Sequence, residues 1–263
     1  MRKRTIYLCL GLSIALACYS TGWGPHNVRA QAESVSADGL ANFSVEFTDC
    51  VESIGVTLVP TGRARAYVPE QFILVGEGQP VTPLVVRTSR CQGIAVNGHN
   101  PMAGETVQIG LVIVPPDGTG DINNYTLWYY TGNPRLATQL RNAGVGAQLV
   151  PTIDFDYDAD DNSLFVRVPR PGSPRLALFG TVSSSPNPAG SFLANWWQQT
   201  EGGSVKMSTN VPVINIGGAD LTLTTDPNGP LGQLIGAGST GFPVLQQFNS
   251  FSGAHMNVSV VSS

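Results

Sequence analysis

The chain has 263 residues, which is enough for one large all-β domain or for two smaller ones. It carries 18 acidic and 14 basic residues and, beyond residues 2–4, no basic run, which excludes a typical binder of nucleic acid or of an anionic membrane surface. No Cys-x-x-Cys pair or cysteine–histidine cluster occurs, so we predict no metal site and no cofactor.

The N-terminal residues have the pattern of a secretory signal peptide. Three basic residues, 2–4, precede an apolar stretch, Ile6–Cys18, that is too short to span a bilayer comfortably. Small residues offer cleavage sites after Ala30 or Ala32, and we favour Ala32. The sequence therefore predicts a signal peptide at residues 1–32 and a secreted or periplasmic protein.

A lipoprotein signal is the alternative interpretation of the same segment. Residues 15–18 approximate a lipoprotein box in which Cys18 carries the lipid, but alanine stands where such a box usually has leucine. We therefore favour a protein with neither a lipid anchor nor a membrane span. Cleavage at Ala32 removes four basic residues and no acidic ones, which leaves ten basic and 18 acidic residues and a net charge of −8.

Two cysteines remain after cleavage, Cys50 and Cys91. In an oxidising compartment such a pair is expected to form one disulfide. The bond closes a loop of about forty residues, which the chain-entropy estimate converts into roughly 4 kcal/mol of stability.

The first predicted elements are a strand, a short helix and a second strand. Residues 42–48 alternate between apolar and polar, as a half-buried strand does. A short helix over residues 61–67 is predicted to end at Pro69. Residues 81–88 form the next strand, and Pro83 within it predicts a sheet edge or a bulge.

A long hairpin from Glu105 to Thr131 is predicted to lie at the centre of the fold. Two apolar arms flank ten residues rich in Pro, Gly, Asp and Asn. The first arm is apolar on both faces towards its end, so both faces are expected to be covered. Only Gln108 and Gly110 interrupt the second face, which predicts a lined cavity or a close packing partner there.

The clearest predicted helix follows the hairpin. Asn133 is a good N-cap, Pro134 suits the first helical position, and Gly144 ends the helix. Residues 186–200, which include two adjacent tryptophans, are predicted to form a connection, with a helix as one option. The other predicted elements are strands at residues 147–157, 163–168, 174–182, 204–207, 211–216, 219–225 and 255–261, and a short helix at 230–235.

Many short strands with abundant glycine and proline predict a mainly β fold. We see no break in composition and no internal repeat, so residues 33–263 are predicted to form a single domain. A closed or partly closed β-barrel is favoured over a β-sandwich, because the central arms lack a solvent face.

Two stretches resemble the acetoacetate decarboxylase-like superfamily of β-barrels: ARAYVPEQF (64–72) and NYTLWYYTGNPRLATQLRNAG (124–144). The likeness covers Arg63 to Tyr157 and implies that family's barrel with an internal cavity. The family's decarboxylases carry a Schiff-base lysine just after the glycine that ends the helix, in a Gly-x-Pro-Lys context. Residues 144–148 of this chain contain no lysine, so the resemblance implies the fold without the decarboxylase chemistry.

Three residues are candidates for catalysis. Lys206, the only lysine after residue 3, lies among small and apolar residues, where a desolvated amine can act as a Schiff base or a general base. Glu105 and His255 are the alternative acid–base pair. An ordinary surface lysine is the more common use of a residue such as Lys206.

Four residues are candidates for binding a ligand: Arg65, Tyr125, Trp128 and Tyr130. An arginine can hold a carboxylate, and tyrosine and tryptophan have polar tips that suit the wall of a cavity. Packing in the core and a surface ion pair are the competing uses.

These residues define three functional hypotheses. The first is an exported β-barrel that binds a small, largely apolar or carboxylate-bearing molecule in its interior without catalysis. The second is an exported lyase-like enzyme that uses Lys206 or the Glu105–His255 pair. The third is a structural envelope protein with no ligand.

Overall fold

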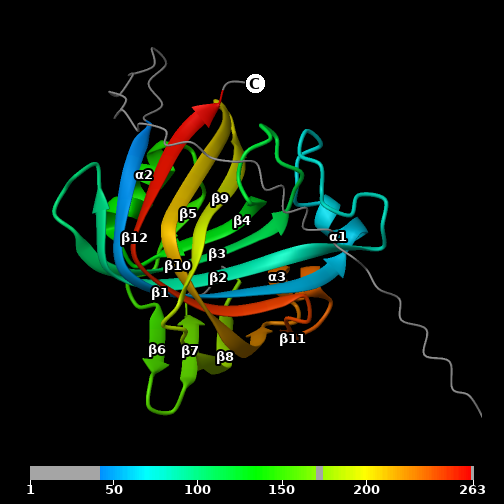
Figure 1. Ribbon diagram of the computed structural model, residues 1–263. Coiled ribbons are helices and arrows are strands. Elements are labelled where there is room, and N and C mark those ends of the chain that lie inside the picture. Colours follow the sequence, from blue (N-terminus) through cyan, green and yellow to red (C-terminus); the bar gives the residue numbers. More distant parts are fainter. Residues whose placement is uncertain (1–41, 170–173, 262–263) are drawn as a thin grey trace, which may run out of the picture. The chain divides into compact units, whose positions relative to one another are not determined.

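The computed structural model describes residues 42–169 and 174–261 (Figure 1). The predicted signal peptide and Cys18 lie outside these described residues. None of the helices in the described part of the chain has the length and apolarity needed to cross a bilayer.

The described residues form twelve strands and three helices. The strands are β1 (Phe43–Pro60), β2 (Val81–Val96), β3 (Met102–Val112), β4 (Ile122–Thr131), β5 (Ala147–Leu149), β6 (Asp154–Asp158), β7 (Ser163–Val168), β8 (Leu176–Ser183), β9 (Pro188–Thr200), β10 (Gly203–Thr225), β11 (Ser239–Gly241) and β12 (Leu245–Val261). The helices are α1 (Thr61–Arg65), α2 (Pro134–Asn142) and α3 (Pro230–Ile235).

The strands form a ring that closes on itself. The hydrogen-bonded order is β12-β1-β2-β3-β4-β9-β10, and β10 pairs again with β12. All neighbours in the ring are antiparallel except β4 and β9, which are parallel. The predicted closed, mainly β architecture is therefore confirmed.

Strand β10 leaves the ring halfway along its length. Its first half pairs with β9 and its second half pairs with β8, which continues the sheet to β7 and β6 (below the ring in Figure 1). Gly217 lies at this branch, where a Cβ would collide with the carbonyl oxygen of Ser183. Only glycine allows the backbones to approach so closely at this position.

Alternate residues of the ring strands point to opposite faces of the sheet and form two cores. The inner core lines the ring, and α2 packs against it. The outer core lies between the other face of β1–β4 and the elements β6–β8, α1 and α3. Inner-core residues include Val45, Val96, Tyr129, Trp196, Val205, Met207, Phe251 and Met256; outer-core residues include Val107, Ile109, Leu111, Ile113, Tyr130, Val166, Leu178, Leu223 and Leu234.

The predicted central hairpin and the predicted caps of α2 are confirmed, but β3 begins earlier, at Met102, β4 begins within the predicted loop, at Ile122, and α1 ends earlier, at Arg65. The arms β3 and β4 are central in the ring and are covered on both faces. At the start of α2, the Asn133 Oδ1 atom accepts a hydrogen bond of 3.0 Å from the backbone N–H of Leu136. Gly144 follows the helix with a φ of +88°, a left-handed conformation that favours glycine.

The helical option for residues 186–200 is wrong, because Pro188–Thr200 is strand β9. The two tryptophans alternate: Trp196 packs in the inner core and Trp197 in the outer core. The three strands predicted between residues 204 and 225 are one strand, β10, and the first and last predicted strands are longer than expected. Hydrogen-bonded neighbours on both sides keep these strands extended even where they contain glycine or polar residues.

The predicted disulfide joins Cys50 and Cys91, which face each other in the register of β1 and β2. Both side chains belong to the inner core and are 2% exposed. The bond therefore fixes the pairing of two strands of the ring.

Candidate functional site

A band of polar side chains crosses the inner face of five adjacent strands. Each strand contributes one main residue, and the pairing register places these residues side by side. We call this set the inner polar band: Asn249 (β12), Glu52 (β1), Arg87 (β2), Gln108 (β3) and Tyr129 (β4). Polar side chains are rare in the interior of a closed ring of strands unless they are hydrogen bonded to one another or bind a ligand.

Arg87 is the centre of the inner polar band. Its Nε atom donates to the Glu52 carboxylate at 2.7 Å, and its Nη1 atom donates to Gln108 Oε1 at 2.7 Å. The Asn249 amide donates to the second oxygen of Glu52 at 3.1 Å. The side chain of Glu52 is 3% exposed and that of Arg87 is 13% exposed, so this ion pair is almost fully removed from water. A guanidinium has five N–H donors, and the two bonds described leave others for a further acceptor.

Several polar atoms of the inner face have no protein partner within the described residues. They are Asn249 Oδ1, Thr126 Oγ1 and Asn124 Oδ1, all of which are buried. Asn124 and Thr126 precede Tyr129 in β4 and lie opposite Val112 and Gly110 of β3. Complete burial raises the pKa of the Tyr129 hydroxyl, and the charge of Arg87 opposes this rise. The inner face therefore combines a guanidinium, a phenol and unpartnered acceptor atoms with apolar side chains.

Sequence reasoning missed most of the inner polar band. Glu52, Arg87 and Asn249 each stand alone in strands that also contain surface residues, so nothing local marks them as buried. Gln108 and Gly110 were the available signal, and the predicted close packing partner occurs at Gly110. Gln108 joins the polar band, whereas a Cβ on Gly110 would lie 2.8 Å from the Trp196 ring.

The structure places the predicted ligand-binding residues outside the inner face. Tyr125 and Tyr130 belong to the outer core, and Trp128 packs against that core. Burial raises the pKa of Tyr125, which the hydrogen bond from the backbone N–H of Gln199 opposes. Arg65 donates to the carbonyl oxygens of the segment that follows α1, at 2.8 Å for Pro69, and pairs with Glu77 at 3.1 Å. The role of these residues in binding stays a prediction.

Lys206 lies on the outer side of β10, beneath the loop between β3 and β4. Its amine donates to Asp117 at 2.6 Å and to Thr119 at 2.7 Å, and it stands 5.3 Å from the centre of the Trp197 ring. Partial burial acts to raise the pKa of Asp117, but the hydrogen bonds from Lys206 and Thr119 outweigh it and lower the pKa. The amine therefore ties the loop between β3 and β4 to β10 through an ion pair and a hydrogen bond.

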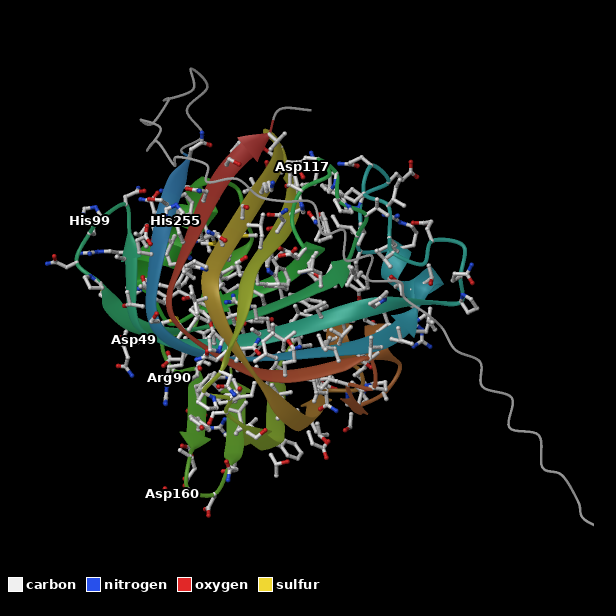
Figure 2. All side chains as sticks on the ribbon, in the orientation of Figure 1. Asp49, Arg90, His99, Asp117, Asp160 and His255 are labelled. Atoms are coloured by element: carbon white, nitrogen blue, oxygen red, sulfur yellow. A yellow bond between two sulfur atoms is a disulfide. The ribbon has the colours of Figure 1, made fainter. Side chains whose placement is uncertain are left out.

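The other two catalytic candidates do not meet Lys206. Glu105 lies beside Arg90 and Gly132. Burial raises the pKa of Glu105, while the backbone hydrogen bond and the charge of Arg90 lower it. His255 pairs with Glu46 on the neighbouring strand, at a different place from Asp117, the partner of Lys206 (Figure 2). The three candidates have separate partners and do not assemble into one site.

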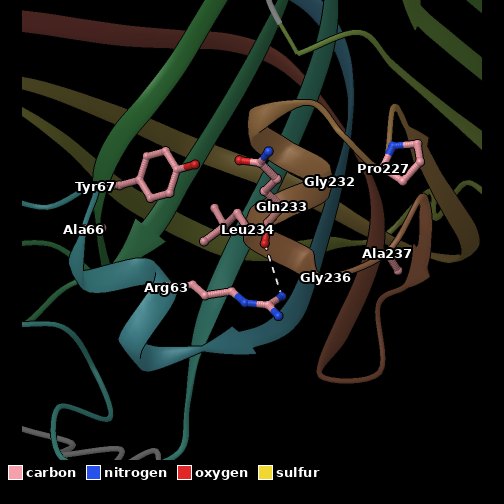
Figure 3. A pocket seen from close by; sticks show the side chains of 9 residues that line it. All are labelled: Arg63, Ala66, Tyr67, Pro227, Gly232, Gln233, Leu234, Gly236 and Ala237. Atoms are coloured by element: carbon pink, nitrogen blue, oxygen red, sulfur yellow. Dashed lines mark hydrogen bonds between the residues drawn. The ribbon is translucent and has the colours of Figure 1, made fainter.

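A cavity of about 510 Å³ lies between α1 and α3, outside the ring (Figure 3). Both helices belong to the outer-core side of the sheet. The residues that line the cavity are Arg63, Ala66, Tyr67, Pro227, Gly232, Gln233, Leu234, Gly236 and Ala237.

Comparison with solved structures identifies the fold. No family model and no curated protein sequence matches the chain. An acetoacetate decarboxylase structure superposes with a TM-score of 0.58 and 10% identity, over 83% of this chain and 89% of that chain. The enduracididine biosynthesis enzyme MppR, complexed with pyruvate, has a TM-score of 0.53 and 11% identity, over 83% of this chain and 88% of that chain. An acetoacetate decarboxylase-like enzyme from Sphingomonas wittichii has a TM-score of 0.53 and 10% identity, over 90% of this chain and 100% of that chain.

These likenesses agree with the ring of strands and with the resemblance of the two sequence stretches described above. At 10 to 11% identity they define the architecture and not the chemistry. The chain therefore has the acetoacetate decarboxylase-like fold.

Proposed function

We propose that this protein binds a small, largely apolar, carboxylate-bearing molecule inside the strand ring and does not transform it. The observation that carries the proposal is the buried Glu52–Arg87–Gln108 network on the inner face. Arg87 keeps donors for a carboxylate, and the unpartnered oxygens of Asn249 and Asn124 suit donor groups of a ligand. The surrounding inner core supplies apolar contacts.

The structural relatives support the class of ligand. The similar enzyme MppR was crystallised with pyruvate, a small carboxylate. A non-catalytic role is supported by the missing lysine in residues 144–148 and by the pairing of Lys206 with Asp117. Glu105 lies beside Arg90 and His255 pairs with Glu46, so the alternative acid–base pair gives no support for catalysis.

Two variants with opposite expected effects test this proposal. Isothermal titration calorimetry with pyruvate and hexanoate should detect binding by the wild-type protein. Arg87→Gln should weaken binding about tenfold or more, because a charge-assisted hydrogen bond is lost. Glu52→Gln should instead strengthen binding, because it removes the carboxylate that competes for the guanidinium.

Opposite changes in affinity in the two variants are informative, because a general folding defect would weaken binding in both. Weaker binding of carboxylates by Glu52→Gln than by the wild type would contradict the proposal. So would wild-type protein that binds neither acid.

We also propose that the protein is exported to an oxidising compartment. The Cys50–Cys91 disulfide supports this location, because such bonds persist mainly outside the cytosol. Expressed with its full N-terminus in a Gram-negative host, the protein should appear in the periplasm or medium with Glu33 as its first residue. Edman sequencing checks this, and a chain that begins with a lipidated Cys18 would contradict it.

A further inference from the structure

We infer that the cavity between α1 and α3 is a second ligand site, which takes a small organic anion with an apolar or aromatic body. It lies on the outer-core side of the sheet and is lined by neither the inner polar band nor the inner core. The inference therefore goes beyond the proposed function and does not depend on it.

The dimensions and walls of the cavity suit a small molecule. Its volume of about 510 Å³ falls within the range of about 300–1,000 Å³ that is usual for ligand sites. Leu234, Ala66, Ala237 and Pro227 form apolar surfaces of the wall (Figure 3).

Arg63 supplies a positive charge that the protein does not neutralise. Its Nη1 atom donates to the carbonyl oxygen of Gln233 at 3.2 Å, and its guanidinium lies against Gly236. Within the described residues Arg63 makes no ion pair, whereas Arg65 pairs with Glu77 and Arg87 pairs with Glu52. One bond to a carbonyl leaves four N–H donors directed elsewhere.

Gly236 explains why the guanidinium can lie where it does. This residue follows α3 with a φ of +78°, and a Cβ here would collide with Arg63 Nη1. The same glycine therefore ends the helix and makes room for the arginine. A single hydrogen bond to the carbonyl oxygen of Gln233 holds the exposed guanidinium at the cavity.

The remaining polar groups of the wall are also held in place. The Tyr67 hydroxyl donates to the carbonyl oxygen of Pro230 at 3.2 Å, and its ring packs edge-on against Trp128 at 5.9 Å. The Gln233 amide donates to the carbonyl oxygen of Asn228 at 3.0 Å. Arg63 is the only charged residue among those that line the cavity, so the wall recognises an anion rather than a cation.

A matched pair of probes tests the inference. The ¹⁵N-labelled protein is titrated with 4-phenylbutyrate and with the uncharged 4-phenylbutanamide, which differ only in the carboxylate. We expect 4-phenylbutyrate to shift the amide resonances of Gly232, Gly236 and Ala237 and to bind about tenfold more tightly than the amide.

Four variants separate the effect of the charge, the effect of the space in the cavity and unspecific effects on the protein. Arg63→Gln should reduce the affinity for the acid to that for the amide, and Arg63→Lys should keep most of the difference. Ala66→Trp should block both probes while Arg63 stays in place. Arg141→Gln, which removes an exposed arginine outside the cavity, should change neither affinity.

Equal affinity of the wild-type protein for the two probes would overturn the inference, and so would an unchanged preference in Arg63→Gln. Shifts confined to residues of the inner polar band would support the ring interior and overturn the second site. Failure of carboxylates to bind the ring interior, with shifts intact in α3, would overturn only the proposed function.

Discussion

Replacing Arg87 with methionine should lower the free energy of unfolding by about 3–5 kcal/mol, because it leaves the Glu52 carboxylate buried without its partner. Both side chains are almost fully removed from water, and their charged atoms are 2.7 Å apart. Gln108 Oε1 also loses the hydrogen bond that it accepts from Arg87 Nη1. Urea unfolding followed by circular dichroism gives the measurement, provided that the slope against denaturant is unchanged.

The chain contains a matched control for this experiment. Arg167 and Asp154 form an ion pair of 2.6 Å, but their side chains are 56% and 42% exposed. Arg167→Met should therefore cost no more than about 1 kcal/mol. The double variant Glu52→Leu/Arg87→Met should recover much of the loss, because replacing both partners removes the unpaired charge. An equal loss in Arg87→Met and Arg167→Met would show that the inner pair does not behave as a buried one.

Removing the disulfide should have an effect of similar size. The double variant Cys50→Ala/Cys91→Ala should lose about 4 kcal/mol, because the bond closes a loop of about forty residues in the unfolded chain. Two buried sulfur atoms also leave the inner core, which adds a small packing loss. The expected readout is a lower urea midpoint for the variant under oxidising conditions.

The reductant dithiothreitol supplies the control. It should lower the urea midpoint of the wild-type protein towards that of the double variant, because the bond becomes accessible on unfolding. It should leave the double variant unchanged, since no other cysteine is present in the described residues. A wild-type midpoint that does not respond to dithiothreitol would contradict the prediction.

Local signals account for what could be predicted. Asn133, Pro134 and Gly144 define α2 because capping, a fixed φ and a left-handed φ are properties of single residues and their neighbours. The bounds of β7 and α3 were likewise predicted, since turn residues flank the strand and Pro230 and Gly236 flank the helix.

Non-local pairing accounts for what was missed. Residues 188–200 became a strand because β4 and β10 pair with them on both sides, whatever their own preference. The same reason joins three predicted strands into β10. Ring closure itself depends on the contact of β10 with β12, which no short stretch of sequence reports.

The candidate site likewise depends on strand pairing that local sequence signals do not report. The aromatic residues Tyr125, Trp128 and Tyr130 stand out in the sequence, but they pack on the outer side of the sheet. The inner polar band depends on register, as with Glu52 and Asn249, which are 197 residues apart and hydrogen bonded. Successive side chains of a strand point to opposite faces of the sheet, but this alternation does not say which face lines the ring.

The sequence by itself therefore determined the central hairpin, the capped helix, the disulfide partners and the resemblance to the acetoacetate decarboxylase-like fold. The tertiary structure alone decided which face became the interior, which polar residues met there, and that an open cavity formed between α1 and α3. The physical reason is range: caps, turns and glycines act over a few residues, whereas a buried polar network exists only once distant strands pair in a single register.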